Sequence, residues 1–273
     1  MKKLCLLLSA ICLLSVPFAV GTARAEGGRT VLQCAYGRVI SADGLDKVIL
    51  SGVDTADSVY TKDIAVTVRG KEKTLEISPA VNGGYNPHIQ LVSFDGVKDQ
   101  IFYGADSGGS GGFGFYYVYD VKNGGAVTLF DAENFPVPYE ARYADFYRVE
   151  VKNTVTGART YIDISQKGEE YLSELYYPDG KLKAPLAADV SPVNAASPFY
   201  LNGEKRYGLE IYYRITGRYS ADGIGNIVVR MTLEDGAFLP FYDVVGGTLT
   251  VYRKIFKIKI DNGPFLLYHN NKL

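Results

Sequence analysis

The sequence has few of the residues from which common catalytic and metal centres are built. It contains 3 cysteines, 2 histidines and no tryptophan in 273 residues. His88 and His269 are far too distant in sequence for the ligand spacing of a zinc site. Neither histidine stands where a serine nucleophile would need its general base. Zinc proteins and serine hydrolases are therefore disfavoured from the start.

The chain also lacks an excess of positive charge and a long apolar run beyond its first residues. Residues 1–25 carry Lys2 and Lys3, an apolar stretch at 4–16, and the small-residue site Ala23-Arg24-Ala25. This pattern is typical of a signal peptide, here cleaved after Ala25. We therefore expect an exported protein, extracellular or periplasmic, without a membrane span.

Removal of the signal peptide leaves a mature chain with one cysteine and a mildly acidic charge. Without Lys2, Lys3 and Arg24, 26 of the 29 basic residues remain against 30 acidic ones, a formal charge of −4. A nucleic-acid partner is not expected, because it would require a basic face. Only Cys34 remains after cleavage, so no intramolecular disulfide can form. Burial must stabilise the fold.

Tyrosine is abundant, with 22 residues, and short apolar runs with period-two alternation fill the chain. These runs predict an all-β protein. Two-residue hairpin turns are expected at Asn123-Gly124 and Asp235-Gly236. A short helix is expected over 168–175, with Leu172 and Leu175 on one side. The prolines at 185, 192 and 198 predict a loop-rich connection.

An internal repeat accompanies the strands. The pattern of strand, wide loop, strand, tight turn and strand at 101–131 recurs at 211–243, with an offset of 110 to 112 residues. We interpret the mature chain, 26–273, as one β-repeat domain forming a propeller-like array of four or five modules. The modules are expected at 38–80, 88–131, 141–190 and 196–243, with C-terminal strands at 247–262. A β-sandwich is the alternative.

Acidic, glycine-containing turns precede several of these strands, as at Asp43-Gly44-Leu45-Asp46 and Asp95-Gly96-Val97-Lys98-Asp99. With the loops at 106–112 and 217–223, they resemble the FG-GAP or VCBS repeats of secreted, integrin-α-like β-propellers. That resemblance covers most of residues 38–245. It implies a fold and an exported location, and calcium as the ion of the acidic loops. The residues it would assign to the metal are Asp43, Asp46, Asp95 and Asp99.

The acidic turns depart from a calcium loop, because Ca²⁺ requires six to eight oxygen ligands. Ser93 or Phe94 stands where an early aspartate would be needed, and the loop near residue 43 is one residue short. The other interpretation is that these aspartates form Asx turns without metal. On that interpretation no cofactor is expected.

The glycine-rich loop at 104–114 contains two motifs that mimic catalytic serines. Gly108-Gly109-Ser110-Gly111-Gly112 matches G-x-S-x-G, and Asp106-Ser107-Gly108-Gly109 resembles the serine loop of trypsin-like proteases. The first motif requires a following helix, whereas the sequence predicts a strand. Both motifs require a histidine that the chain does not supply. A catalytic serine is therefore not expected.

We instead predict that the loops at 104–114 and 214–225 form a recognition surface for a cell-envelope glycan or another protein. Loops at equivalent ends of repeated units often carry function. The residues expected to bind are Asp106, Ser107, Ser110, Arg218, Tyr219 and Asp222. The alternative function is a carbohydrate-active hydrolase that uses acidic residues on the loop face, where a pair of carboxyls would be needed. Bracing of the loop by Arg218 and Asp222 is the competing structural role.

Overall fold

A computed structural model describes residues 28–55, 58–109 and 111–246, and these residues form an all-β protein. The expected fold class is thus confirmed. The signal peptide at 1–25, Ser110 and the expected strands at 247–262 lie outside the described residues. No helix in the part of the chain that the structure describes is long and apolar enough to cross a membrane.

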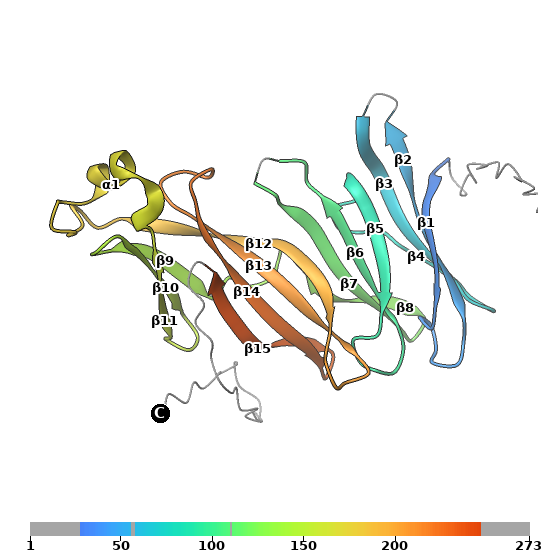
Figure 1. Cartoon of the computed structure of the whole chain (residues 1–273). Helices are drawn as coiled ribbons and strands as arrows, with labels where there is room; N and C mark the ends of the chain where they lie inside the picture. Colours follow the sequence, from blue (N-terminus) through green and yellow to red (C-terminus); the bar gives the residue numbers. More distant parts are fainter. Residues whose placement is uncertain (1–27, 56–57, 110, 247–273) are drawn as a thin grey trace, which may run out of the picture.

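The described strands are arranged in two antiparallel sheets that lie side by side (Figure 1). The first sheet has the order β1-β2-β3-β5-β6-β7-β8, and β4 pairs with β3. Its strands are β1 (Thr30–Gly37), β2 (Asp46–Thr55), β3 (Ser58–Arg69), β4 (Thr74–Ile77), β5 (Gly84–Val92), β6 (Gln100–Asp106), β7 (Gly114–Lys122) and β8 (Gly125–Asp131).

The second sheet has the order β11-β10-β9-β12-β13-β14-β15. Its strands are β9 (Tyr139–Ala144), β10 (Arg148–Asn153), β11 (Arg159–Asp163), β12 (Ala187–Tyr200), β13 (Tyr207–Thr216), β14 (Gly223–Glu234) and β15 (Ala237–Gly246). A 3-10 turn (Ser165–Lys167) and the short helix α1 (Glu169–Leu175) connect β11 to β12. The expected helix is confirmed, and Leu172 and Leu175 both pack against the core.

Two sheets replace the expected four or five modules. The two sheets contact each other through one shared apolar cluster. In this cluster Phe94 and Phe130 of the first half meet Phe238 of β15 edge-on, with ring centroids 5.2 and 6.2 Å apart. Each buried phenylalanine stabilises the contact by about 1.5–3 kcal/mol.

Strand β6 separates this shared core from a second one inside the first sheet. Because successive side chains of a strand point to opposite faces, Phe102 belongs to the shared core, whereas Ile101 and Tyr103 belong to the inner core. All three are buried. The first sheet curls around its inner core, and Gln33 of β1 closes the curl. Its side-chain amide exchanges two hydrogen bonds of 2.9 Å with the backbone of Ile89 on β5.

The internal repeat is present as two equivalent meanders. Strands β6-β7-β8 and β13-β14-β15 each run strand, loop, strand, tight turn, strand. Both tight turns have two successive residues with positive φ, at 50° and 76° for Asn123 and Gly124 and at 50° and 84° for Asp235 and Gly236. These angles are those of type I′ hairpins, so the expected turns are confirmed.

The expected loop-rich connection at residues 185–198 is wrong from Ala187 onward, where the 14-residue strand β12 (Ala187–Tyr200) begins. Two features explain why prolines are tolerated there. Pro192 lies in a bulge, where the register with β13 shifts between Val190 and Val193. On its other side, β12 pairs with β9 only at Ala187 and Ala188. Pro198 therefore lies on a free edge, where the missing N–H does not interrupt a ladder.

Candidate functional site

The two loops singled out in the sequence lie at the same edge of the molecule (Figure 1). Loop 107–113 joins β6 to β7, and loop 217–222 joins β13 to β14. Arg214, near the end of β13, connects them, because its guanidinium donates a 3.0 Å hydrogen bond to the carbonyl of Gly111. The predicted proximity of the loops thus rests on one arginine between the two sheets.

A polar pocket of about 420 Å³ lies beside this arginine. Its lining is Arg214, Asn194 of β12, and Gly223, Ile224, Gly225 and Asn226 of β14. Asn194 enters the pocket because it is the extra residue of a bulge, between Val193, which pairs with Tyr213, and Ala195, which pairs with Tyr212. Bulges commonly redirect a side chain next to a functional site.

Two polar groups of this pocket lack a partner that their chemistry calls for. The side-chain oxygen of Asn194 is buried and accepts no hydrogen bond from any described residue. Arg214 has no acidic partner within residues 28–55, 58–109 and 111–246. A buried acceptor without a donor costs about 1–3 kcal/mol. The pocket is therefore complementary to a ligand that brings a negative charge and a hydrogen-bond donor.

Asp222 is buried and engaged within its own loop. Its Oδ1 accepts a hydrogen bond from Lys167 at 2.7 Å, and its Oδ2 accepts from Tyr171 at 2.6 Å and from the backbone N–H of Arg218 at 2.9 Å. Burial alone would raise the pKa of Asp222, but these hydrogen bonds and the Lys167 charge hold it below its usual value. Asp222 thus fixes the loop, as the competing structural role foresaw.

The other predicted binding residues are spread along the loop edge. Asp106 accepts a 2.9 Å hydrogen bond from Asn86, and the Ser107 N–H donates to Phe113 at 2.9 Å. Arg218 forms an ion pair with Glu174 of α1. Tyr219 is 62% exposed. Sequence reasoning pointed to the two loops and did not name Asn194 or Asn226, which line the pocket beside Arg214. The signal that could have found Asn194 was its position between two prolines in an expected loop.

Three of the four aspartates that the resemblance assigned to calcium are hydrogen-bonded within the chain. Asp46 accepts from the backbone N–H groups of Val39 and Ile40. Asp95 accepts from Val97, Lys98 and Gln100, and Asp99 accepts from the N–H of Arg38. Asp43 is exposed. In the described part of the chain, no three His, Cys, Asp or Glu side chains form a group that could hold a metal ion.

A lysine ammonium occupies the centre of this acidic turn region. Lys98 Nζ contacts Oδ1 of Asp120 at 2.5 Å and donates to the carbonyls of Val39 and Val121 at 3.0 and 2.6 Å. Asp120 is 1% exposed and also pairs with Lys122 at 2.9 Å. Burial opposes ionisation of Asp120, but the two lysines keep its pKa below the usual value. Here the chain supplies its own cation.

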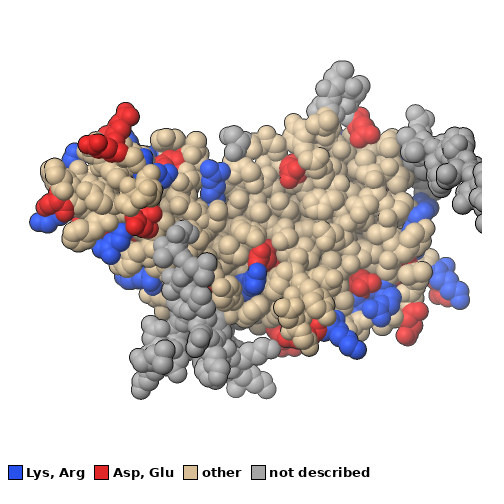
Figure 2. Space-filling model, viewed as in Figure 1, with Lys and Arg blue, Asp and Glu red and all other residues tan. Residues whose placement is uncertain are grey.

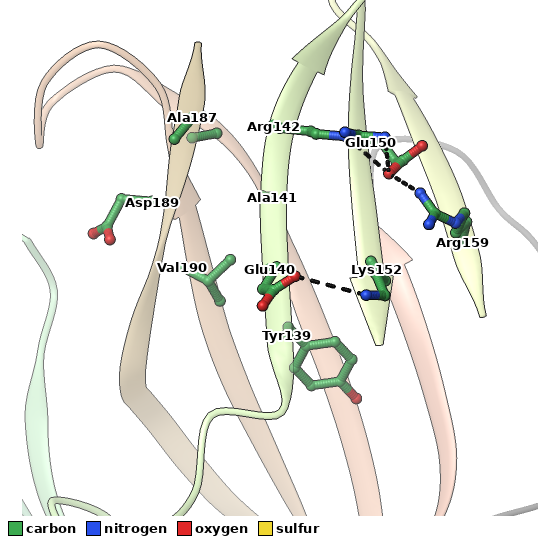
Figure 3. A pocket seen from close by; sticks show the side chains of 11 residues that line it. Tyr139, Glu140, Ala141, Arg142, Glu150, Lys152, Arg159, Ala187, Asp189 and Val190 are labelled. Carbon is green, nitrogen blue, oxygen red and sulfur yellow. Dashed lines mark hydrogen bonds and ion pairs between the residues drawn. The ribbon is translucent and has the colours of Figure 1, made fainter. Parts of the chain in front are cut away.

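A second hollow, of about 490 Å³, lies on the face of β9–β12 and is lined by three carboxylates, Glu140, Glu150 and Asp189 (Figure 3). Glu150 is buried and accepts hydrogen bonds from Arg142, Arg159 and Tyr161. Burial would raise the pKa of Glu150, but these partners lower it. A general acid needs a raised pKa. The Glu150 cluster is therefore a charge network that joins three strands.

Charged side chains are unevenly distributed over the surface. On the face shown in Figure 2 they are sparse over the middle and gather at the two ends, one of which carries α1. The middle of this face is formed by uncharged side chains of the two sheets.

Comparison with known proteins identifies a family. The YybI C-terminal domain family matches residues 137–245. The chain is also 30% identical over 206 residues to a protein of Bacillus subtilis (strain 168) named "Uncharacterized protein YybI". The matched region spans 73% of this chain and 78% of that protein. No solved structure matches.

These matches correct the resemblance to FG-GAP or VCBS repeats, which is wrong, since no such repeat family matches. The physical source of the error is visible in the fold. The acidic turns precede β2 and β6, and Asp46 and Asp95 there accept hydrogen bonds from backbone N–H groups.

Proposed function

The chain belongs to the YybI family, and from the pocket beside Arg214 we propose that it is an exported, non-enzymatic binding protein that recognises an acidic saccharide of the cell envelope. The single observation that carries this proposal is the pair of unsatisfied groups in the pocket, the Arg214 guanidinium and the Asn194 oxygen. Export follows from the signal peptide pattern at 1–25.

Arg214 selects for a carboxylate or a similar anion. A guanidinium binds a carboxylate through two parallel, charge-assisted hydrogen bonds. One nitrogen of Arg214 is used by the Gly111 carbonyl, which holds the side chain at the pocket. The remaining donors are available to a ligand.

Asn194 and Asn226 select for hydroxyl groups. The buried Asn194 oxygen requires a donor, and each side-chain amide can both donate and accept. Gly223 keeps the wall of the pocket low beside Arg214, so a ring can approach the backbone. A sugar that carries a carboxylate and several hydroxyls combines the required features.

The experiment compares acidic and neutral ligands of the same shape. We would titrate oligogalacturonate and its methyl ester into the full mature chain by isothermal titration calorimetry. We expect the acidic oligosaccharide to bind at least about tenfold more tightly, a difference of about 1.4 kcal/mol. Equal affinity for the two would contradict the proposal.

Variants assign the binding to the pocket. Arg214→Gln keeps a donor for the Gly111 carbonyl but removes the charge, and it should abolish the preference for the acidic ligand. Arg218→Ala is the matched control, because Arg218 is already paired with Glu174 and lies outside the lining of the pocket. Release of new reducing ends from the saccharide would replace the proposal by a hydrolase.

A further inference from the structure

A separate hollow of about 700 Å³ lies beside α1, at the far end of the second sheet. Its walls are aromatic and apolar, formed by Tyr147, Tyr176, Tyr177, Leu172 and Pro178, with Glu169 among its polar residues. Ligand sites typically combine an apolar floor with a few polar groups that fix orientation. This hollow has that composition.

The aromatic walls are held rigidly. Tyr176 is buried, and its hydroxyl donates to the carbonyls of Ala144 and Arg148 at 3.1 and 3.3 Å. Tyr147 meets Tyr176 edge-on, with centroids 5.0 Å apart. Tyr147 and Phe146 have φ of 56° and 63°. Such angles are strained for bulky residues and persist where the surroundings impose them, so the ring of Tyr147 is presented at a conformational cost.

The rim of the hollow carries tyrosine hydroxyls and carboxylates that have no partner among the described residues. Tyr177 is 53% exposed, and neither its hydroxyl nor that of Tyr147 makes a hydrogen bond to a described residue. Glu169 and Glu170 are exposed and form no ion pair within the described ranges. Lys183 is already engaged, since its Nζ donates to the carbonyl of Ser173 at 2.6 Å and lies 5.8 Å from the centre of the Tyr177 ring.

We propose that this hollow binds a proline-rich segment of a partner protein, with a basic residue of that segment next to Glu169. A polyproline II helix has unpaired backbone carbonyls and a preformed shape, and it docks into aromatic-lined grooves. The tyrosine hydroxyls supply donors to those carbonyls. Leu172 and Pro178 receive the proline rings, and Glu169 and Glu170 attract the cation.

A saccharide fits this hollow less well than the peptide. Sugar recognition requires several converging polar side chains to satisfy its hydroxyls, because a buried hydroxyl without a partner is costly. Here the polar lining is Ser165, Ser173, Glu169 and Lys183, of which Lys183 is already engaged, and the rest of the lining is three tyrosines, a leucine and a proline. The two sites of the molecule therefore differ in chemistry, and Arg214 does not line this hollow.

The test is fluorescence anisotropy of a labelled synthetic peptide that carries two Pro-x-x-Pro repeats and a terminal arginine, titrated with the full mature chain. We expect saturable binding that Tyr177→Ala weakens at least about tenfold, as for an interface hot spot. Tyr36→Ala is the control, because Tyr36 is 63% exposed but lies on the first sheet. It should leave the affinity unchanged.

Charge and specificity give independent readouts. Glu169→Gln should weaken binding of the arginine peptide several-fold but not that of a peptide with alanine in its place. Arg214→Gln should leave peptide binding unchanged, which separates this site from the saccharide pocket. Lack of saturable binding, or equal binding by the Tyr177→Ala protein, would overturn the proposal. Displacement of the peptide by a neutral oligosaccharide from the hollow would also overturn it.

Discussion

The meanders β6-β7-β8 and β13-β14-β15 have the same turn geometry but are tied at opposite ends. In the first, Lys98 and Asp120 form a buried ion pair next to the hairpin turn. In the second, Lys167 and Asp222 form one at the wide loop. The two meanders therefore share their strand arrangement, whereas the position of the ion pair determines which end of each meander is held in place.

The consequence is an asymmetric pair of loops around one pocket. Loop 217–222 is fixed by its own Asp222. Loop 107–113 contains Gly108 and Gly112 at φ of 82° and 67° and is held to the second sheet by Arg214. The saccharide pocket that we propose lies beside Arg214, the residue that holds the glycine-rich loop.

The largest expected effect comes from removing the Lys98–Asp120 ion pair of the first meander. Asp120→Ala removes the carboxylate and leaves the largely buried Lys98 with two carbonyls. Loss of one partner of a buried ion pair costs about 3–5 kcal/mol, which urea denaturation would measure. The double variant Lys98→Met/Asp120→Leu should recover most of this stability. A single-variant loss below about 1 kcal/mol would show that the tie is unimportant.

A steric change at Gly217 tests how Asp222 holds the wide loop of the second meander. A Cβ added at Gly217 would lie 2.2 Å from Oδ2 of Asp222 and 2.2 Å from the hydroxyl of Tyr143. Gly217→Ala should therefore cost about 1–3 kcal/mol, as overpacking does. In the matched control, Gly223→Ala, the nearest atom is Arg214 at 3.6 Å. Equal losses in thermal unfolding would contradict the explanation.

Low pH should weaken the Lys167–Asp222 ion pair of the second meander. The pKa of Asp222 is lowered in the folded protein from an unfolded value of about 3.9. Its contribution to stability is therefore complete above about pH 4 and is lost as the pH falls through the folded pKa. Carboxyl NMR titration would measure this pKa, and Lys167→Met should raise it. No change in that variant would refute the role of Lys167.

The smallest effect compares the two hairpins directly. Gly124→Ala and Gly236→Ala each place a side chain at positive φ, and each should cost about 1 kcal/mol. A Cβ at residue 124 also displaces Lys73, whose Nζ donates to the Gly124 carbonyl at 2.5 Å. At residue 236 nothing lies within 4 Å. Gly124→Ala should therefore be slightly more destabilising in chemical denaturation.

Local patterns predicted much of this fold. Alternation identified the strands, and Asn123-Gly124 and Asp235-Gly236 predicted their turns, because these signals act over a few residues. The number of sheets depends on contacts such as Phe94 with Phe238. Such contacts join residues far apart in sequence and leave no local periodicity, so the division into modules failed.

The candidate site was predictable only in outline. Equivalent loops pointed to one edge of the molecule, and Arg214 lay at the boundary of a predicted loop. Asn194 was hidden, because its role depends on a bulge inside a strand that its prolines argued against. Likewise, whether an aspartate binds a metal or a backbone N–H depends on where its neighbours point, which spacing alone does not determine.

The ammonium of Lys98 has a consequence for how the fold responds to the surrounding medium. A dissociable ion would make the folded fraction depend on the composition of the medium, through mass action. A cation carried by the chain is present at a fixed effective concentration. The end of the fold that it joins to Asp120 is therefore insensitive to dilution, and no chelator can strip that ammonium from it.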